Sequence, residues 1–321
     1  MANEKDIKTV EKVDNTCKIK RLFIRRASNY STVLSKTYSK WFAIFLLPTL
    51  AAFTIGFIWP FLQGLYLSFC KFITTNDAEW IWFDNYITAF KDDSFRYSFF
   101  YTALFAIVSL LSINIIAFAV AYALTRGIKG SNLFRTVFFM PNLIGGIVLG
   151  YIWSLIFDGI LSRFGTSILL STKYGFLGLL VLMCWQQVGY MMIIYIAGLQ
   201  NVPEDLIEAA KIDGASGRRI LRKIIIPSVM PSITICTFLT LTNSFKLFDQ
   251  NLALNGGQPF IFQGESVIKT TEMLALNIYN TFYLNVNYRG VGQAKAVLFF
   301  ILVAAIGLIQ LRATRSKEVQ Q

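Results

Sequence analysis

The chain has 321 residues, of which 55% are hydrophobic and 15% are charged, and its formal net charge is +12. A water-soluble domain of this length does not carry so high a hydrophobic share, because too much apolar surface would face water. The sequence contains no histidine, which excludes Ser-His-Asp catalysis, histidine-bound metals and histidine proton relays. Its four cysteines are far apart and form no CxxC pair, so we expect small packing residues and neither disulfides nor a metal site.

The first 39 residues are predicted to be a basic cytoplasmic segment that is flexible or lies on the membrane surface. They are polar, and residues 1–40 hold ten lysines and arginines. A signal peptide is excluded because the first apolar run begins too late and is too long.

Residues 40–312 are predicted to form one transmembrane domain. Long runs in this region carry almost no charge, and a helix of about 20 such residues crosses the roughly 30 Å hydrocarbon layer. Because lipid offers no hydrogen-bond partners and the runs do not alternate with a period of two, each run is expected to be a helix. We therefore predict an all-α integral membrane protein with six transmembrane helices. The predicted spans are 41–69, 97–124, 134–157, 175–198, 225–247 and 294–312.

The basic residues set the orientation of these spans. Of the 30 lysines and arginines, 21 lie in the N-terminal segment, in the second and fourth connections and at the C-terminal end. Seven lie in the other connections, and Lys246 and Lys295 lie at span ends. Cytoplasmic loops are enriched in these residues, so both termini, including the tail 313–321, are predicted to be cytoplasmic. The membrane surface thus accounts for the net charge, and no nucleic-acid partner is expected.

The connection at 248–293 is the longest of the predicted external loops. It begins with the turn-forming sequence Asn255-Gly256-Gly257. Further on, residues 270–282 place apolar side chains at helical spacing, which predicts a short helix at the outer membrane surface.

The connection at 200–224, between the fourth and fifth spans, has the local chemistry of two short helices. Asn201 and Pro203 suit the start of the first helix, and Gly214 supplies a stop with positive φ. Ser216 is a candidate cap for a second helix that carries four basic residues. This compact helix–turn–helix is predicted on the cytoplasmic face, where the groove of a partner protein can bind it.

Glu208-Ala209-Ala210, followed by Gly214 and by Ile224-x-Ile226-Pro227, resembles the EAA motif of binding-protein-dependent ABC importer permeases. Ile226 takes the place of the usual leucine. The flanking sequence is similar to the carbohydrate-uptake branch, of which the maltose-type permeases are the best known, and the resemblance covers roughly residues 40–312. It also rests on Trp185-Gln186, Ala197-Gly198-Leu199-Gln200, Asp213-Gly214-Ala215, Asp84-Asn85-Tyr86 and Phe138-x-Met140-Pro141.

The resemblance implies the type I fold of ABC importer permeases, in a multi-pass subunit of the bacterial cell membrane. It implies a coupling helix seated in a cytoplasmic ABC ATPase dimer, a heterodimer with a second, homologous permease, and an extracytoplasmic solute-binding protein. The chain has no GxxxxGK[ST] sequence, so ATP and magnesium are expected on the ATPase, with no cofactor in this chain. The residues expected to couple to the ATPase are Glu204, Ile207, Glu208, Ala209, Ala210, Asp213, Gly214 and Ala215.

Polar side chains inside the spans are costly and mark a solute pathway by default. Neutral amides and hydroxyls suit the hydroxyl groups of a carbohydrate, and aromatic faces suit its C–H surface. No intramembrane carboxylate is present for a cation, which favours a neutral, polyhydroxylated solute. Hydrogen bonding between helices is the alternative role of each residue. The candidates are Asn142, Tyr151, Trp185, Gln187, Tyr190, Asn243, Ser244 and Lys246.

The predicted function is therefore ATP-driven import of a sugar, with an oligosaccharide favoured, by a lipid-embedded permease subunit that is not itself an enzyme and has no catalytic residue. A secondary transporter or channel for a small neutral solute is the alternative, although sugar carriers of that kind have about twice as many spans. That alternative leaves the EAA loop unexplained. An intramembrane enzyme is disfavoured because the chain lacks histidine and paired intramembrane carboxylates.

Overall fold

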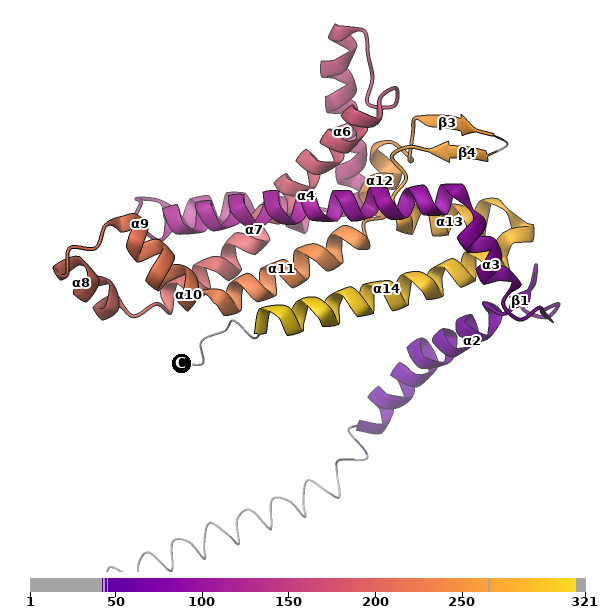
Figure 1. Ribbon diagram of the computed structural model, residues 1–321, viewed down its shortest axis with the longest axis horizontal. Coiled ribbons are helices and arrows are strands. Elements are labelled where there is room, and N and C mark those ends of the chain that lie inside the picture. The colour runs from indigo at the N-terminus through magenta and orange to yellow at the C-terminus, as the bar shows by residue number, and fades with distance from the viewer. Residues whose placement is uncertain (1–41, 43, 45, 265, 316–321) are drawn as a thin grey trace, which may run out of the picture. The chain divides into compact units, whose positions relative to one another are not determined.

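The structure is a computed structural model, and it describes residues 42, 44, 46–264 and 266–315 (Figure 1). Contacts within the chain divide it into two units, Met1–Gly64 and Leu65–Gln321. The predicted N-terminal segment 1–39 and residues 316–321 of the predicted tail lie outside the described residues.

A helix that begins in the first unit and ends at Leu67 has one wide turn. The backbone forms a π-turn over Thr54–Ile58 and returns to α-helix in α2 (Trp59–Leu67). The first N–H group of α2 bonds to the carbonyl five residues earlier, one residue further than in an α-helix. Pro60 follows and has no N–H group to donate, so the wide turn coincides with the proline. The segment Leu46–Leu67 is long and apolar enough to cross a membrane.

The second unit is mainly helical and has two antiparallel hairpins. One pairs β1 (Cys70–Lys71) with β2 (Glu79–Trp80), and the other pairs β3 (Phe260–Gln263) with β4 (Ser266–Lys269). The sequence reading placed no hairpin here. The helices are α3 (Asp84–Lys91), α4 (Asp93–Leu124), α5 (Ser131–Phe139), α6 (Gly146–Leu161), α7 (Thr172–Gln200), α8 (Glu204–Ile212), α9 (Gly217–Ile220), α10 (Ile226–Ser228), α11 (Met230–Phe245), α12 (Asp249–Leu254), α13 (Leu274–Leu284) and α14 (Arg289–Arg315).

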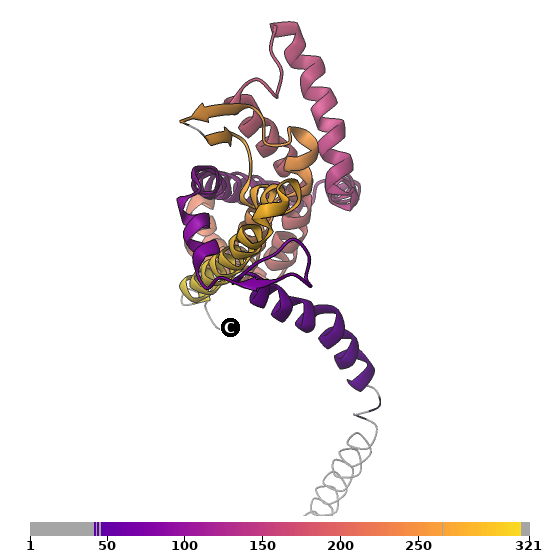
Figure 2. The ribbon, with the colours of Figure 1, turned by 90° about the vertical axis from the view of Figure 1, so that its right-hand side faces the viewer.

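Four long helices, α4, α7, α11 and α14, lie side by side and form the bundle of this unit (Figure 1). α8 and α9 lie at one end of the bundle. α3, α13 and both hairpins lie at the other end, which we call the distal end. α6 points away from the bundle in both views and packs on α12 (Figures 1 and 2).

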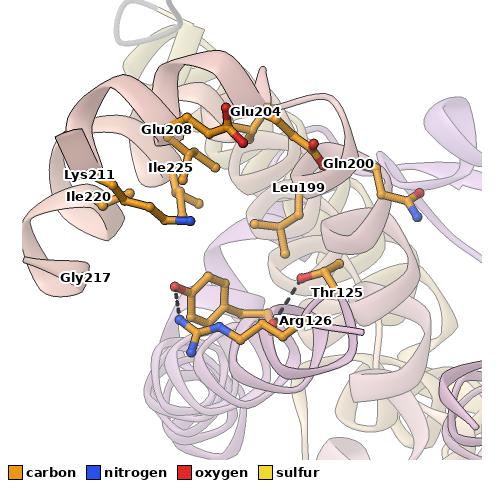
Figure 3. A pocket seen from close by; sticks show the side chains of 13 residues that line it. Thr125, Arg126, Leu199, Gln200, Glu204, Glu208, Lys211, Gly217, Ile220 and Ile225 are labelled. Atoms are coloured by element: carbon orange, nitrogen blue, oxygen red, sulfur yellow. Dashed lines mark hydrogen bonds between the residues drawn. The ribbon is translucent and has the colours of Figure 1, made fainter. Parts of the chain in front are cut away.

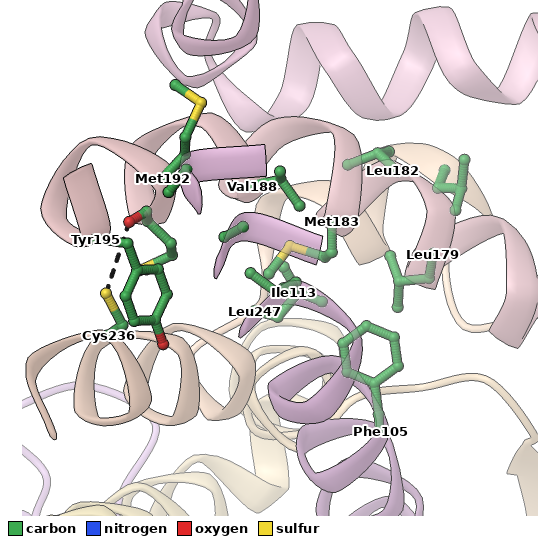
Figure 4. Close-up of a cluster of buried hydrophobic side chains, with 14 of the residues drawn as sticks. Phe105, Ile113, Leu179, Leu182, Met183, Val188, Met192, Tyr195, Cys236 and Leu247 are labelled. Atoms are coloured by element: carbon green, nitrogen blue, oxygen red, sulfur yellow. Dashed lines mark hydrogen bonds between the residues drawn. The ribbon is translucent and has the colours of Figure 1, made fainter. Parts of the chain in front are cut away.

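The interior of the bundle is apolar and closely packed. Because lipid tails are as apolar as these side chains, packing and hydrogen bonds hold such helices together. Asn114 of α4 accepts a bond from the Tyr195 hydroxyl at 2.7 Å and donates one to Thr240 Oγ1 at 3.2 Å. It thereby ties α4 to α7 and α11. The buried side chains of the bundle core include Phe105, Ile113, Leu182, Met183 and Cys236 (Figure 4).

The predicted third span, 134–157, is not one continuous helix in the structure. A 3-10 turn at Met140–Leu143 follows α5, and α6 begins only at Gly146. Pro141 has no N–H group to continue a helix, and Gly145 is extended with ψ of 142°. The uniformly apolar composition of this region hides the break from a hydropathy argument.

Two glycines of α6 explain its close contact with α12. A Cβ atom on Gly146 would lie 2.8 Å from Asp249 Cβ, and one on Gly150 would lie 2.7 Å from Ala253 Cβ. Neither position has room for a side chain. The pair therefore lets the two helices approach, as small residues four positions apart do in membrane proteins.

The predicted fifth span, 225–247, is bent. Helical segments at 217–228 and 230–245 meet at 70°, and Pro227 and Pro231 on either side of the bend remove two backbone donors. The described residues hold five single helices that are long and apolar enough to cross a membrane, and the bent pair makes a sixth. The prediction of six transmembrane helices is thus confirmed with one span bent.

The distal end contains a buried ion pair. Lys295 of α14 is fully buried, and its Nζ lies 2.6 Å from Asp92 Oδ2. It also donates to Asn277 Oδ1 at 3.0 Å and to Thr281 Oγ1 at 2.8 Å, both on α13. Asp92 caps α4 at the same time, because its other oxygen accepts the N–H of Ser94 at 2.9 Å. One ammonium group thus joins α14, α13 and the start of α4.

Gly189→Ala is expected to destabilise the bundle by about 2 kcal/mol, because α7 crosses α5 too closely for a side chain. A Cβ atom at this position would lie 1.8 Å from the carbonyl oxygen of Phe138. Thermal unfolding in detergent should show a lowered Tm. Gly159→Ala is the matched control, since no atom lies within 4 Å of a Cβ there. Equal losses of Tm in the two variants would contradict this interpretation.

Candidate functional site

The loop between α7 and α11 forms a short exposed helix. Asn201 is the C-terminal cap of α7, and Pro203, in an extended conformation, precedes α8. Asn201 therefore ends one helix and does not start the next, which corrects the predicted cap. α8 begins at Glu204, with two carboxylates in its first turn and a lysine in its last turn. This order of charges complements the helix dipole.

α8 ends on a left-handed glycine, as predicted. Gly214 has a φ of +74°. Its N–H bonds to the carbonyl of Lys211 at 3.0 Å, and the N–H of Ala215 bonds to the carbonyl of Ala210 at 2.9 Å. This pair of bonds is a Schellman motif, which satisfies the last carbonyls of a helix. No atom lies within 4 Å of a Cβ at Gly214, so the backbone conformation, and not a lack of space, requires glycine.

One side of α8 lines a cavity of about 810 Å³. Arg126, just beyond α4, lies on the far side of this cavity, with its guanidinium 4.3 Å from the ring centre of Tyr122. Glu208 is exposed and makes no ion pair with another described residue. Its carboxylate is therefore available to a partner. The lining residues on α8 are Glu204, Ile207, Glu208 and Lys211, and those around α4 are Tyr122, Thr125 and Arg126 (Figure 3).

α8 also exposes apolar side chains that do not line this cavity. Leu206 and Ile212 are 51% and 86% exposed, and apolar side chains at the tip of a loop are typical of a surface that a partner covers. A smaller hollow of about 260 Å³ between α8 and α9 is lined by Ala210, Asp213 and Ala215. The eight predicted coupling residues thus lie on α8 and its C-terminal turn. Three of these residues line the larger cavity and three line the smaller hollow. Ala209 is exposed, and Gly214 forms the turn.

The second helix of the loop is less regular than predicted. α9 is one turn long and continues through a π-turn at Leu221–Ile225 into α10. Pro227 follows this π-turn, as Pro60 follows the one in the first unit, because a proline leaves the preceding carbonyls without an α-helical donor. Ser216 precedes α9 in an extended conformation, but its side chain makes no capping hydrogen bond.

Two of the predicted pathway residues lie together. Asn243 Nδ2 of α11 donates to Gln187 Oε1 of α7 at 3.4 Å. The neighbouring Gln186 accepts a bond from Gln250 of α12 at 2.8 Å and donates to the carbonyl of Ile144 at 3.3 Å. Adjacent amides of α7 therefore reach two different helices. Sequence reasoning missed Gln250 because it lies in the predicted external loop.

The other predicted pathway residues do not form one cluster. Ser244 is fully buried, and its hydroxyl lies 2.8 Å from that of Ser109 on α4, which is the interhelical role named as the alternative. The aromatic ring of Trp185 lies 5.6 Å from that of Trp153 on α6. Asn142 lies in the 3-10 turn, Tyr151 is exposed on α6, Tyr190 packs on the core, and Lys246 is exposed at the end of α11.

The sequence relatives of the chain are transport permeases. Residues 113–316 match the family model described as binding-protein-dependent transport system inner membrane component. The probable starch degradation products transport system permease protein AmyD of Thermoanaerobacterium thermosulfurigenes is 40% identical over 288 residues, which cover 87% of this chain and 96% of that protein. The multiple sugar-binding transport system permease protein MsmF of Streptococcus mutans is 27% identical over 289 residues, which cover 87% of this chain and 97% of that protein.

Solved structures share the fold. A chain of a bacterial ABC transporter that imports the acidic polysaccharide alginate superposes with a TM-score of 0.72 at 19% identity, covering 88% of this chain and 98% of that chain. In ABC importers the permease is the membrane subunit, and a separate ATPase hydrolyses ATP. The family match begins within α4 and covers the rest of the bundle and the α8 loop, and AmyD matches nearly end to end. The chain therefore belongs to the family of binding-protein-dependent transport system inner membrane components, as an integral membrane permease of an ABC importer.

Proposed function

We propose that this permease imports a neutral oligosaccharide and that α8 couples import to a cytoplasmic ABC ATPase dimer. The observation that carries the coupling is the geometry of α8, an exposed helix that ends at Gly214. The carboxylate of Glu208 faces a cavity and makes no ion pair within the described part of the chain. A rigid exposed helix suits a groove in a partner. The charge distribution supports a cytoplasmic position for this loop and for both termini.

The proposed solute class rests on two amides and on the relatives. Gln187 and Asn243 are neutral and half-buried where α7 meets α11, and amides both donate to and accept from sugar hydroxyls. AmyD is named for starch degradation products and MsmF for multiple sugars. Ser244 is left out of the proposed pathway because its hydroxyl already bonds between helices.

The proposed importer also contains a second, homologous permease and an extracytoplasmic solute-binding protein. Leu143, Ile147 and Leu155 expose an apolar surface on α6 and the turn before it, and this surface suits another membrane subunit. The similar alginate transporter, with a TM-score of 0.71, has been solved in complex with a periplasmic protein that carries an alginate pentasaccharide.

Competition for uptake tests the solute class. Proteoliposomes with the complete importer receive a labelled malto-oligosaccharide, with unlabelled malto-oligosaccharide or sn-glycerol 3-phosphate as competitor. The phosphate is included because another relative, of Agrobacterium fabrum, is a permease for that compound at 29% identity. We expect inhibition by the oligosaccharide alone. Uptake of the labelled oligosaccharide that sn-glycerol 3-phosphate inhibits as strongly as the unlabelled oligosaccharide does would overturn the proposal.

Gln187→Ala and Asn243→Ala are each expected to raise the KM for uptake roughly tenfold, which corresponds to about 1.4 kcal/mol for a lost hydrogen bond to the solute. Assembly of the importer should be unchanged, as measured by co-purification of its subunits. Ser244→Ala serves as control, because a residue that bonds only between helices should leave the KM unaltered. Unchanged uptake kinetics in both amide variants would make these residues structural.

A further inference from the structure

A short helix at the distal end has an exposed apolar face. Phe83, Ile87 and Phe90, in α3 and the residue before it, are 59%, 50% and 60% exposed. Successive residues of a helix are about 100° apart, so these three side chains lie on one side. Together with the half-buried Tyr86 beside them, they are called the α3 apolar face below.

The remainder of α3 divides into a polar face and a buried face. Asp84, Thr88 and Lys91 are exposed and lie next around the helix from Ile87. Asn85 is buried on the opposite side, and its Nδ2 donates to two backbone carbonyls at 3.0 and 2.9 Å, one of them in β1. These bonds fix the rotation of α3 and so the direction of both exposed faces. An apolar face directly beside a polar one is typical of a helix that lies in a membrane–water boundary.

α3 lies at the depth where this boundary is expected. α4 presents an apolar side, with Phe100, Leu104, Ile107, Leu111 and Ile115 each 54–70% exposed, and this side belongs in the hydrocarbon layer. Asp92 alone separates α3 from α4 in sequence. Phe100 lies about 10 Å along α4 from its first residue, and the headgroup layer is roughly 5–8 Å thick on each side of a bilayer. α3 is therefore at headgroup depth.

Two tryptophans are exposed just before α3, one at the end of the hairpin and one in the turn that follows it. Trp82 has a φ of +58°, and among the described residues it is the only non-glycine residue with a positive φ. Bulky residues rarely adopt this conformation. Trp82 is 67% exposed, and its ring lies 5.8 Å from that of Trp80, which is 42% exposed. Tryptophan is concentrated at membrane–water interfaces, where its ring lies among the headgroups.

We infer that the α3 apolar face, with Trp80 and Trp82, binds the headgroup–acyl boundary of the lipid leaflet on the side opposite α8. The apolar face contacts acyl chains, while the polar face, with Lys91, meets phosphate groups and water. Continuity with the hydrocarbon-facing side of α4 favours lipid over a protein as the occupant. Because α3 packs on both α4 and α14, this contact holds the distal ends of two spans at a set depth.

Photo-cross-linking in the complete importer tests the assignment. A photoreactive p-benzoylphenylalanine replaces Ile87 or Phe90 on the apolar face, or Thr88 on the polar face as the matched control, in phosphatidylcholine vesicles. Mass spectrometry should find lipid adducts at 87 and 90 at least fivefold more often than at 88. Adducts at 87 and 90 with a second permease or a binding protein would overturn the assignment, as would equal lipid labelling at 88.

A second measurement tests the proposal if the cross-linking variants do not fold or do not react. The fluorescence of Trp82 is obtained as the difference in tryptophan emission between the unmodified protein and Trp82→Phe. This difference is measured in ordinary vesicles and in vesicles whose lipid carries bromine, a quencher, near the top of the acyl chain. Emission from Trp82 is expected to fall at least twofold in the brominated lipid. Emission from Trp82 that bromine leaves unchanged would show that the ring does not touch lipid.

Discussion

Glu208→Lys is expected to abolish transport while the protein still accumulates in the membrane. The side chain is exposed and makes no ion pair within the described residues. Its replacement should therefore change the free energy of unfolding by no more than about 0.5 kcal/mol. A reversed charge at a partner contact costs about 2 kcal/mol or more, which is at least a thirtyfold loss. Glu208→Gln keeps the size and loses only the charge, so an intermediate loss is expected. Transport-coupled ATP hydrolysis at the normal rate in Glu208→Lys would refute the coupling role.

The turn after α8 offers an independent variant of the same prediction. Gly214→Pro removes the N–H that bonds to Lys211 and fixes φ near −65°, far from the observed +74°. The direction of the chain after α8 changes, and transport is expected to be lost. Gly214→Asn should keep much of the activity, since asparagine tolerates a left-handed backbone. Gly217→Ala is the control glycine, because nothing lies within 4 Å of its Cβ and its φ is not positive.

Lys295→Met is expected to destabilise the distal end by about 3 kcal/mol, because it leaves the Asp92 carboxylate without its cation and two hydrogen-bond acceptors of α13 without a donor. The value lies at the lower limit for a broken buried pair, since the Asp92 side chain is 33% exposed. Thermal unfolding of the detergent-solubilised protein should show a Tm lowered by roughly 6–12 °C.

Two further variants separate loss of the ion pair from loss of packing. Asp92→Asn combined with Lys295→Met removes both charges while asparagine still caps α4, so at least half of the lost Tm should return. Lys173→Met removes an exposed lysine at the start of α7 and should leave the Tm within about 1 °C. A Tm as low in the double variant as in Lys295→Met would mean that packing, and not charge, holds this site.

The positions of most spans follow from the sequence, because apolar length alone decides whether a helix can cross a membrane. The second and fourth predicted spans lie within α4 and α7, with ends that differ by four residues or fewer. The third and fifth were predicted with a kink or an end at Pro141 and Pro231, but hydropathy could not tell the break at Pro141 from the 70° bend between Pro227 and Pro231. A proline shows where a helix is weakened, but tertiary packing decides whether it ends, bends or widens.

Local turn chemistry made the α8 loop the most predictable part of the site. The end of α8 at Gly214 requires only a left-handed backbone conformation, which glycine adopts easily, and Gly214 has this conformation in the structure. The partners of the polar groups were harder to predict because they come from distant parts of the chain. Lys295 was read as a residue at a span end, and its bond to Asp92 joins positions 203 residues apart. Asn114 was missed because a single amide in an apolar run gives no sign of its partners.

ATP dependence of uptake tests the central claim most directly. The complete importer is reconstituted in vesicles with its ATPase either intact or carrying a substitution of the phosphate-binding lysine of its P-loop, and entry of the labelled oligosaccharide is measured with and without ATP. Uptake is expected only with ATP and the intact ATPase, because this chain has no nucleotide-binding sequence of its own. Uptake that continues at the same rate without ATP hydrolysis would contradict the claim and would indicate a secondary transporter or channel.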